Sequence, residues 1–132
     1  MLKRLLVLCA LVAALVVPAT ASAATSTNVT VQSATLLNNF QVQVVGTIQC
    51  VATEQYFVQV QVFQRGPGQT NQTGSGSTSG ICQSNSPQSW VITVTGGPFS
   101  PGKALIQAFG QVCGVTACAS DQDDRTIRLQ RA

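Results

Sequence analysis

Cysteines and carboxylates are the side chains of this chain best able to take part in catalysis or metal binding. Its 132 residues include five cysteines, four acids and no histidine. Without histidine, Ser-His-Asp and Cys-His catalysis and imidazole-ligated metal sites are excluded. Glycoside hydrolysis needs two carboxylates across a cleft, and a folded sheet could bring Glu54 near Asp121. The three aspartates within residues 121–124 are typical of a solvated turn, however, and Glu54 of an exposed loop. We therefore expect no enzymatic activity and no cofactor.

The cysteines are expected to form disulfides. Cys9 lies in the N-terminal apolar segment, which leaves Cys50, Cys82, Cys113 and Cys118. The close spacing of Cys113 and Cys118 favours a local disulfide between them, and Cys50 then pairs with Cys82. A tetrathiolate zinc site is the alternative, but such sites usually show two close C-x-x-C pairs. We therefore predict two disulfides and no metal.

The N-terminus has the three zones of a secretory signal peptide. Lys3 and Arg4 precede an apolar run at residues 5–17, and small residues follow at 21–23. We expect residues 1–23 to be removed and residues 24–132 to form one domain of a secreted, extracellular protein. An uncleaved membrane anchor is the alternative, although the run is short for a span. The remaining five cations and four anions give a net charge of +1, which argues against nucleic-acid binding.

Alternation of apolar and polar residues predicts strands throughout the domain. The clearest cases are 40–50, 56–64, 90–95 and 104–109, with weaker strands at 28–36 and 125–130. Residues 66–80, rich in Gly, Ser and Thr, are expected to form a loop and then a polar edge strand reaching Cys82. Residues 113–124 are expected to connect the last two strands. Seven short strands separated by turn signals predict an all-β fold, an immunoglobulin-like antiparallel β-sandwich, with a small closed barrel as the alternative.

Several short motifs carry a resemblance. They are G-x-x-x-C at Gly46–Cys50, V-x-V-x-Q within the run from Val58 to Gln64, the Gly-rich turn before Cys82, Q-x-W ending at Trp90, and F-x-P-G-x-A from Phe99 to Ala104. In these motifs the chain resembles a group of small secreted actinobacterial proteins that are similar to immunoglobulin-like sandwiches and have no established activity. The Cys113–Cys118 spacing is similar to a close pair in the apoproteins that carry enediyne chromophores, whose first cysteine pair is closer together than Cys50 and Cys82.

Loops at one end of such a sandwich are the expected recognition surface. The connections at residues 51–55, 83–88 and 113–124 would gather there, forming a binding tip that includes Glu54, Gln55, Asp121 and Asp123. We expect a binding module for an extracellular protein, a glycan or a small molecule, the last as a small-ligand carrier. A structural or self-assembling surface protein is the alternative, because the uncharged exposed faces favour self-association. Calcium binding by residues 121–124 also stays open.

Overall fold

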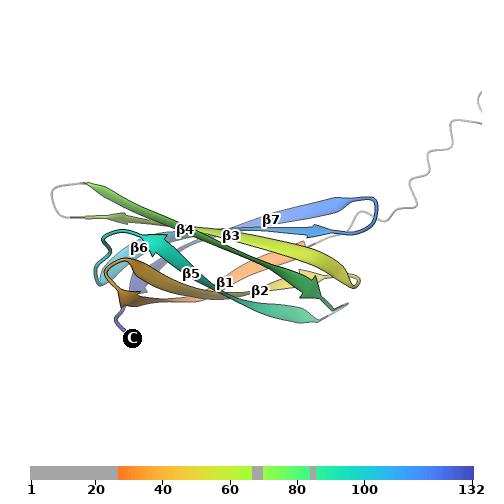
Figure 1. Ribbon diagram of the computed structural model, residues 1–132, viewed down its shortest axis with the longest axis horizontal. Helices are drawn as coiled ribbons and strands as arrows, with labels where there is room; N and C mark the ends of the chain where they lie inside the picture. The colour runs from red at the N-terminus through yellow and green to blue at the C-terminus, as the bar shows by residue number, and fades with distance from the viewer. Residues whose placement is uncertain (1–26, 67–69, 84–85) are drawn as a thin grey trace, which may run out of the picture.

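The computed structural model describes residues 27–66, 70–83 and 86–132, which form seven strands and no helix (Figure 1). The strands are β1 (Thr27–Asn38), β2 (Gln41–Cys50), β3 (Glu54–Arg65), β4 (Asn71–Cys82), β5 (Pro87–Gly96), β6 (Gly102–Cys113) and β7 (Cys118–Leu129). The expected signal peptide at 1–23 lies outside the described residues, as do residues 84 and 85 of one expected tip loop.

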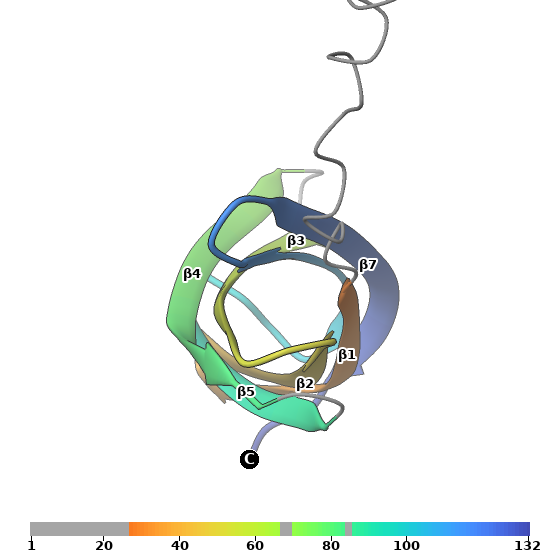
Figure 2. The same cartoon turned by 90° about the vertical axis from the view of Figure 1, so that its right-hand side faces the viewer.

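The strand order confirms the predicted fold class. All neighbouring strands run antiparallel in one sheet with the order β1-β2-β5-β4-β3-β6-β7. An immunoglobulin constant-type sandwich has one sheet of strands A-B-E-D and another of C-F-G, and these two sets follow each other in the order found here. The β3–β4 hairpin joins the sets through 12 paired positions. The sheet therefore curls until it is nearly closed, as the end-on view in Figure 2 shows.

The junction between β1 and β7 cannot be an antiparallel ladder. In a sequence of seven antiparallel strands, the first and the last run in the same direction. The two meet through a parallel bridge between Leu36 and Arg131. The Leu36 N–H donates to the Gln130 carbonyl oxygen at 2.9 Å, and the Ala132 N–H donates to the Leu36 carbonyl oxygen at 3.1 Å. Backbone pairing thus closes the junction only near the C-terminus.

Side-chain alternation fills the interior as the sequence predicts. Along β3, Val58, Val60 and Val62 are fully buried, whereas Gln59 and Gln61 are exposed. Strands β2, β5 and β6 contribute similar rows of buried apolar residues, including Val42, Val44, Ile48, Ile92, Val94, Ile106 and Ala108. Burial of these side chains is the main stabilising contribution to the fold. One exception is Phe40, which precedes β2 in a turn and is 59% exposed.

A glycine makes room for the single tryptophan. Gly46 of β2 pairs with Trp90 of β5, and Trp90 is 2% exposed. A Cβ atom at Gly46 would collide with the indole ring and with the Thr30 carbonyl oxygen. A glycine inside a strand often marks such a close approach. Trp90 is thus a core residue, as its shared face with Ile92 and Val94 predicts.

Two polar strands differ from the sequence predictions. The Gly/Ser/Thr-rich strand β4 begins at Asn71 and follows β3 along its whole length, but it pairs with β5 only at Gly74 and Ser75. The last strand, β7, begins at Cys118, so the predicted connection at 113–124 is wrong; only residues 114–117 connect β6 and β7. The reason is pairing, because β6 offers 12 consecutive partners to the polar residues of β7.

Candidate functional site

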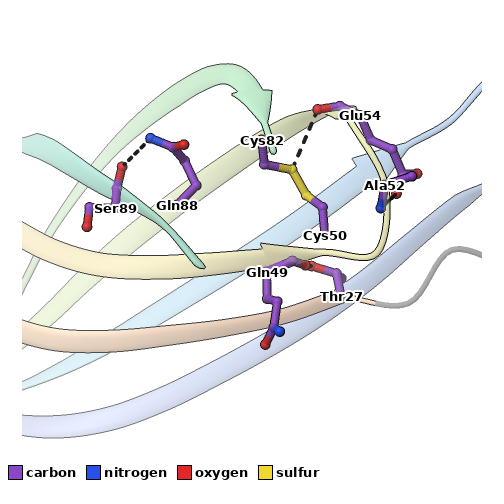
Figure 3. The surroundings of a disulfide bond; sticks show 8 residues. All are labelled: Thr27, Gln49, Cys50, Ala52, Glu54, Cys82, Gln88 and Ser89. Atoms are coloured by element: carbon purple, nitrogen blue, oxygen red, sulfur yellow. Dashed lines mark hydrogen bonds between the residues drawn. A yellow bond between two sulfur atoms is a disulfide. The ribbon is translucent and has the colours of Figure 1, made fainter. Parts of the chain in front are cut away.

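Both predicted disulfides are present, and they lie at one end of the molecule. Cys50 ends β2 and Cys82 ends β4, and their Cα atoms are 6.2 Å apart (Figure 3). Cys113 ends β6 and Cys118 begins β7, with Cα atoms 4.1 Å apart. The connections at 51–53 and 114–117, together with residues 83 and 86 beside β4 and β5, belong to the same end, which appears at the right of Figure 1 and faces the viewer in Figure 2. We call it the braced end.

A cleft of about 450 Å³ lies at the braced end. It is formed between the turn that joins β2 to β3 and the turn that joins β6 to β7. Its lining consists of residues 51–55 and 113–117, which are mostly small or apolar and include Val51, Ala52, Val115 and Ala117. Small-molecule sites typically have about 300–1,000 Å³ and an apolar lining with few polar groups. The cleft has the size and the composition of such a site.

Glu54 is the one ionisable residue that lines the cleft outside the disulfide. It occupies the first interior-facing position of β3, in the row that continues with Tyr56 and Val58, and it is only 6% exposed. The Ala52 N–H donates to Oε1 at 3.2 Å, whereas Oε2 is buried and has no hydrogen-bond partner among the described residues. The expectation of an exposed loop charge at Glu54 is therefore wrong.

The Cys50–Cys82 disulfide lies against the backbone of Glu54. Glu54 pairs with Cys82 across the β3–β4 hairpin, and its carbonyl oxygen lies 3.5 Å from Cys82 Sγ (Figure 3). The next residue, Gln55, faces outward and pairs with Ile81 and Cys113. Glu54 and Gln55 thus both line the cleft, in agreement with their placement at the predicted tip.

Asp121 and Asp123 lie outside the cleft, between β7 and β1. Both lie within β7, and their carboxylates accept hydrogen bonds from the edge of β1. The Val29 N–H donates to Asp121 Oδ2 and the Val31 N–H donates to Asp123 Oδ2, each at 2.8 Å. The two carboxylates therefore replace the missing backbone ladder between β1 and β7. They connect β7 to β1 along the junction of these two strands, which we call the seam, and they do not line the cleft. The prediction that they lie in a solvated turn is wrong.

The third aspartate of the cluster points elsewhere. Asp124 is exposed and accepts a hydrogen bond from Gln122 Nε2 at 2.9 Å, and alternation puts it on the opposite face of β7 from Asp123. Asp123 also forms an ion pair with Arg125 at 2.9 Å. Among the described residues, no group of three or more Cys, Asp or Glu side chains could hold a metal ion.

Charges are unevenly distributed along the molecule. Each described cation lies in or beyond the half of its strand that is farther from the cleft; these residues are Arg65, Lys103, Arg125, Arg128 and Arg131. None of them lines the cleft. The Glu54 carboxylate therefore has no cationic neighbour within the cleft. Lys103, the one lysine of the described chain, is near the opposite end of β6.

The predicted tip loops contain the apolar residues of the cleft, but no role was predicted for them. Val115 is fully exposed between Cys113 and Cys118, and Val51 is 47% exposed directly after Cys50. Valine in a turn is unusual, because turns favour Gly, Pro, Asn, Asp and Ser. An exposed apolar residue beside each disulfide is therefore a signal that could have placed the cleft.

The part of the chain that the structure describes contains no helix long and apolar enough to cross a membrane. No family model matches the chain, and no curated protein matches it. Among solved structures, the chain is similar to Spo0M, a sporulation control protein from Bacillus subtilis, with a TM-score of 0.40 and 13% sequence identity. The match covers 83% of this chain and 50% of the Spo0M chain, so this chain spans about half the length of that structure.

Proposed function

We propose that the protein is a secreted, non-catalytic binding module that receives its ligand in the cleft at the braced end. Two disulfides support an oxidising compartment, since such bonds are rare in the cytosol. The signal-peptide pattern of residues 1–23 supports export. The actinobacterial group that the chain resembles is also secreted, which agrees with this location.

The cleft is the observation that carries the proposal. Each of its two walls is a short turn next to a disulfide, Cys50–Cys82 on one side and Cys113–Cys118 on the other. A turn that is already fixed loses little conformational entropy when a ligand binds. Removal of exposed valines from water by a bound ligand lowers the free energy of the complex. Rigid walls with an apolar lining are the features of a preformed binding site.

A fragment screen followed by NMR on the oxidised protein tests this proposal. We expect apolar fragments to shift the amide resonances of residues 51–55 and 113–117. The variant Val115→Asp should lose these shifts, because it places a charge in the apolar lining. Val91→Asp is the matched control, since Val91 is also an exposed valine but lies on β5. Shifts that survive in Val115→Asp, or that cluster away from the cleft, contradict the proposal.

Self-assembly is the second candidate, and the outer face of β3 and β6 favours it. Phe57 and Phe109 are each 39% exposed there among glutamines, and no charged residue occurs at 55–64 of β3 or at 104–113 of β6. Charged side chains normally prevent sheets from associating. If this candidate is right, sedimentation will show concentration-dependent oligomers that Phe57→Lys and Phe109→Lys abolish. A monomer at millimolar concentration rules it out.

A further inference from the structure

We infer that the ligand of the cleft is an apolar molecule carrying a protonated amine, and that the amine donates a hydrogen bond to Glu54 Oε2 after the Glu54 side chain has rotated towards the cleft. The inference rests on the proposed function and specifies the chemistry of the ligand. It depends on the carboxylate oxygen of Glu54 that has no described hydrogen-bond partner, on the location of the cations and on the apolar lining of the cleft.

The Glu54 carboxylate is incompletely satisfied. A carboxylate can accept about four hydrogen bonds, yet Glu54 accepts one described bond, from the Ala52 N–H to Oε1. Its Oε2 atom is buried without any partner. Burial of a charged group is costly unless the group is paired and hydrogen-bonded. Because Oε2 has no surface open to solvent, the Glu54 side chain must rotate towards the cleft before a ligand donor can reach it. A donor that then pairs with Oε2 offsets part of the cost of burying the charge.

The described chain offers no donor of its own for this position. The one salt bridge among residues that the structure describes is between Arg125 and Asp123, on β7. The lysine and the arginines lie towards the opposite end of the molecule, and none lines the cleft. Buried carboxylates are normally paired. A cation supplied by a ligand is therefore the missing partner of Glu54.

The lining defines the rest of the ligand. Apart from Glu54 and a few polar atoms of Thr53, Gln55 and Thr116, the cleft presents two valines, two alanines, Gly114 and Cys113. An apolar body will bury this surface while a single charged head reaches Glu54. The net charge of the chain without residues 1–23 is +1, so long-range attraction does not favour a cation. Preference for an amine must then come from the local contact.

An ammonium group suits this site better than a neutral donor. Either donor forms a charge-assisted hydrogen bond with an ionised carboxylate. An ammonium group adds a direct charge–charge attraction that a neutral donor lacks, and this attraction is stronger where solvent is partly excluded. A primary amine with a pKa near that of lysine, about 10.4, is protonated at neutral pH. The same head group occurs on small arylalkylamines and on lysine side chains of proteins. A capped peptide with a lysine between two phenylalanines distinguishes the second source from the first.

The test compares three probes that share a phenyl group and four methylenes and differ only in the head group: 4-phenylbutylamine, 4-phenylbutanol and 5-phenylvalerate. Calorimetry and NMR on the oxidised protein give the Kd and the location of each. We expect the amine to bind at least tenfold more tightly than the alcohol and the carboxylate to bind most weakly. In Glu54→Gln, the amine should lose this advantage while the alcohol binds unchanged, which also shows that the cleft is folded. Asp124→Asn is the matched control, because Asp124 is an exposed acid outside the cleft.

The outcomes separate this inference from the proposed function. If amine and alcohol bind the cleft equally well, or if Glu54→Gln keeps the preference for the amine, the inference is overturned and the binding module stands. If none of the three probes shifts residues 51–55 and 113–117, both fail for small ligands. Tighter binding of the capped peptide than of 4-phenylbutylamine, lost in Glu54→Gln, supports the amine chemistry and assigns its source to a protein.

Discussion

The seam between β1 and β7 should depend on two carboxylates. Asp121 and Asp123 each accept one hydrogen bond from a β1 backbone N–H at 2.8 Å. A hydrogen bond to a charged group contributes about 1.5–3 kcal/mol, and about 1–2 kcal/mol is reasonable for these part-buried sites. Replacing both residues with alanine should therefore lower the free energy of unfolding by about 2–4 kcal/mol. At about 4 °C per kcal/mol, the Tm should fall by about 8–16 °C.

Circular dichroism melts of the oxidised protein measure this change. The double replacement with asparagine keeps an acceptor oxygen at each position and should cost less than half as much. Amide exchange gives a local readout, because the N–H groups of Val29 and Val31 should exchange faster in both variants. Asp124→Ala is the matched control, since Asp124 bonds only with the Gln122 side chain among the described contacts.

Two results would refute this reasoning. One is a Tm for the double alanine variant no lower than that of Asp124→Ala. The other is unchanged exchange at Val29 and Val31. Either result would mean that the carboxylates accept these hydrogen bonds without stabilising the seam, and that the parallel bridge at Leu36 is enough to hold β1 against β7.

Two further changes test the interior and the braced end. Gly46→Ala should destabilise the protein by about 1–3 kcal/mol or more, seen as a lower Tm, because the added Cβ collides with Trp90 and the Thr30 carbonyl oxygen; an unchanged Tm would contradict the close approach. Replacing Cys50 and Cys82 with serine opens a loop with a sequence separation of 32, and chemical denaturation should show a loss of roughly 3–4 kcal/mol. Equal stability would mean that the disulfide does not restrict the unfolded chain.

The sequence predicts those strands in which β-branched residues alternate with polar ones. In β3, β5 and β6, one face is apolar and the other polar, so both the strand and its buried face follow from a period of two. Strand β4 lacks this signal because its interior positions include three glycines, at 74, 76 and 80, and its exposed positions are mostly serine and threonine. Glycine leaves the interior face without side chains, so pairing with β3 decides the structure instead.

The sequence predicts which connections and disulfides gather at the braced end, but it groups four acids there of which only Glu54 lines the cleft. Strand order puts three connections and both disulfides at one end, and Glu54 and Gln55 are found there. Asp121 and Asp123 appear in the sequence as part of an acidic turn, since aspartate is uncommon in strands. Their role depends on β1, which is 92 residues away in the sequence for each contact. No local pattern can reveal a contact that exists only after the sheet has curled.

The proposed chemistry of the cleft is tested most directly by a crystal structure of the oxidised protein with 4-phenylbutylamine. We predict that the phenyl group lies between residues 51–55 and 113–117, and that the amine nitrogen is about 2.7–2.9 Å from Glu54 Oε2. A phenyl group in the cleft with its amine turned towards solvent would contradict the role of Glu54. A ligand bound instead on the outer face beside Phe57 and Phe109 would contradict the cleft as the binding site.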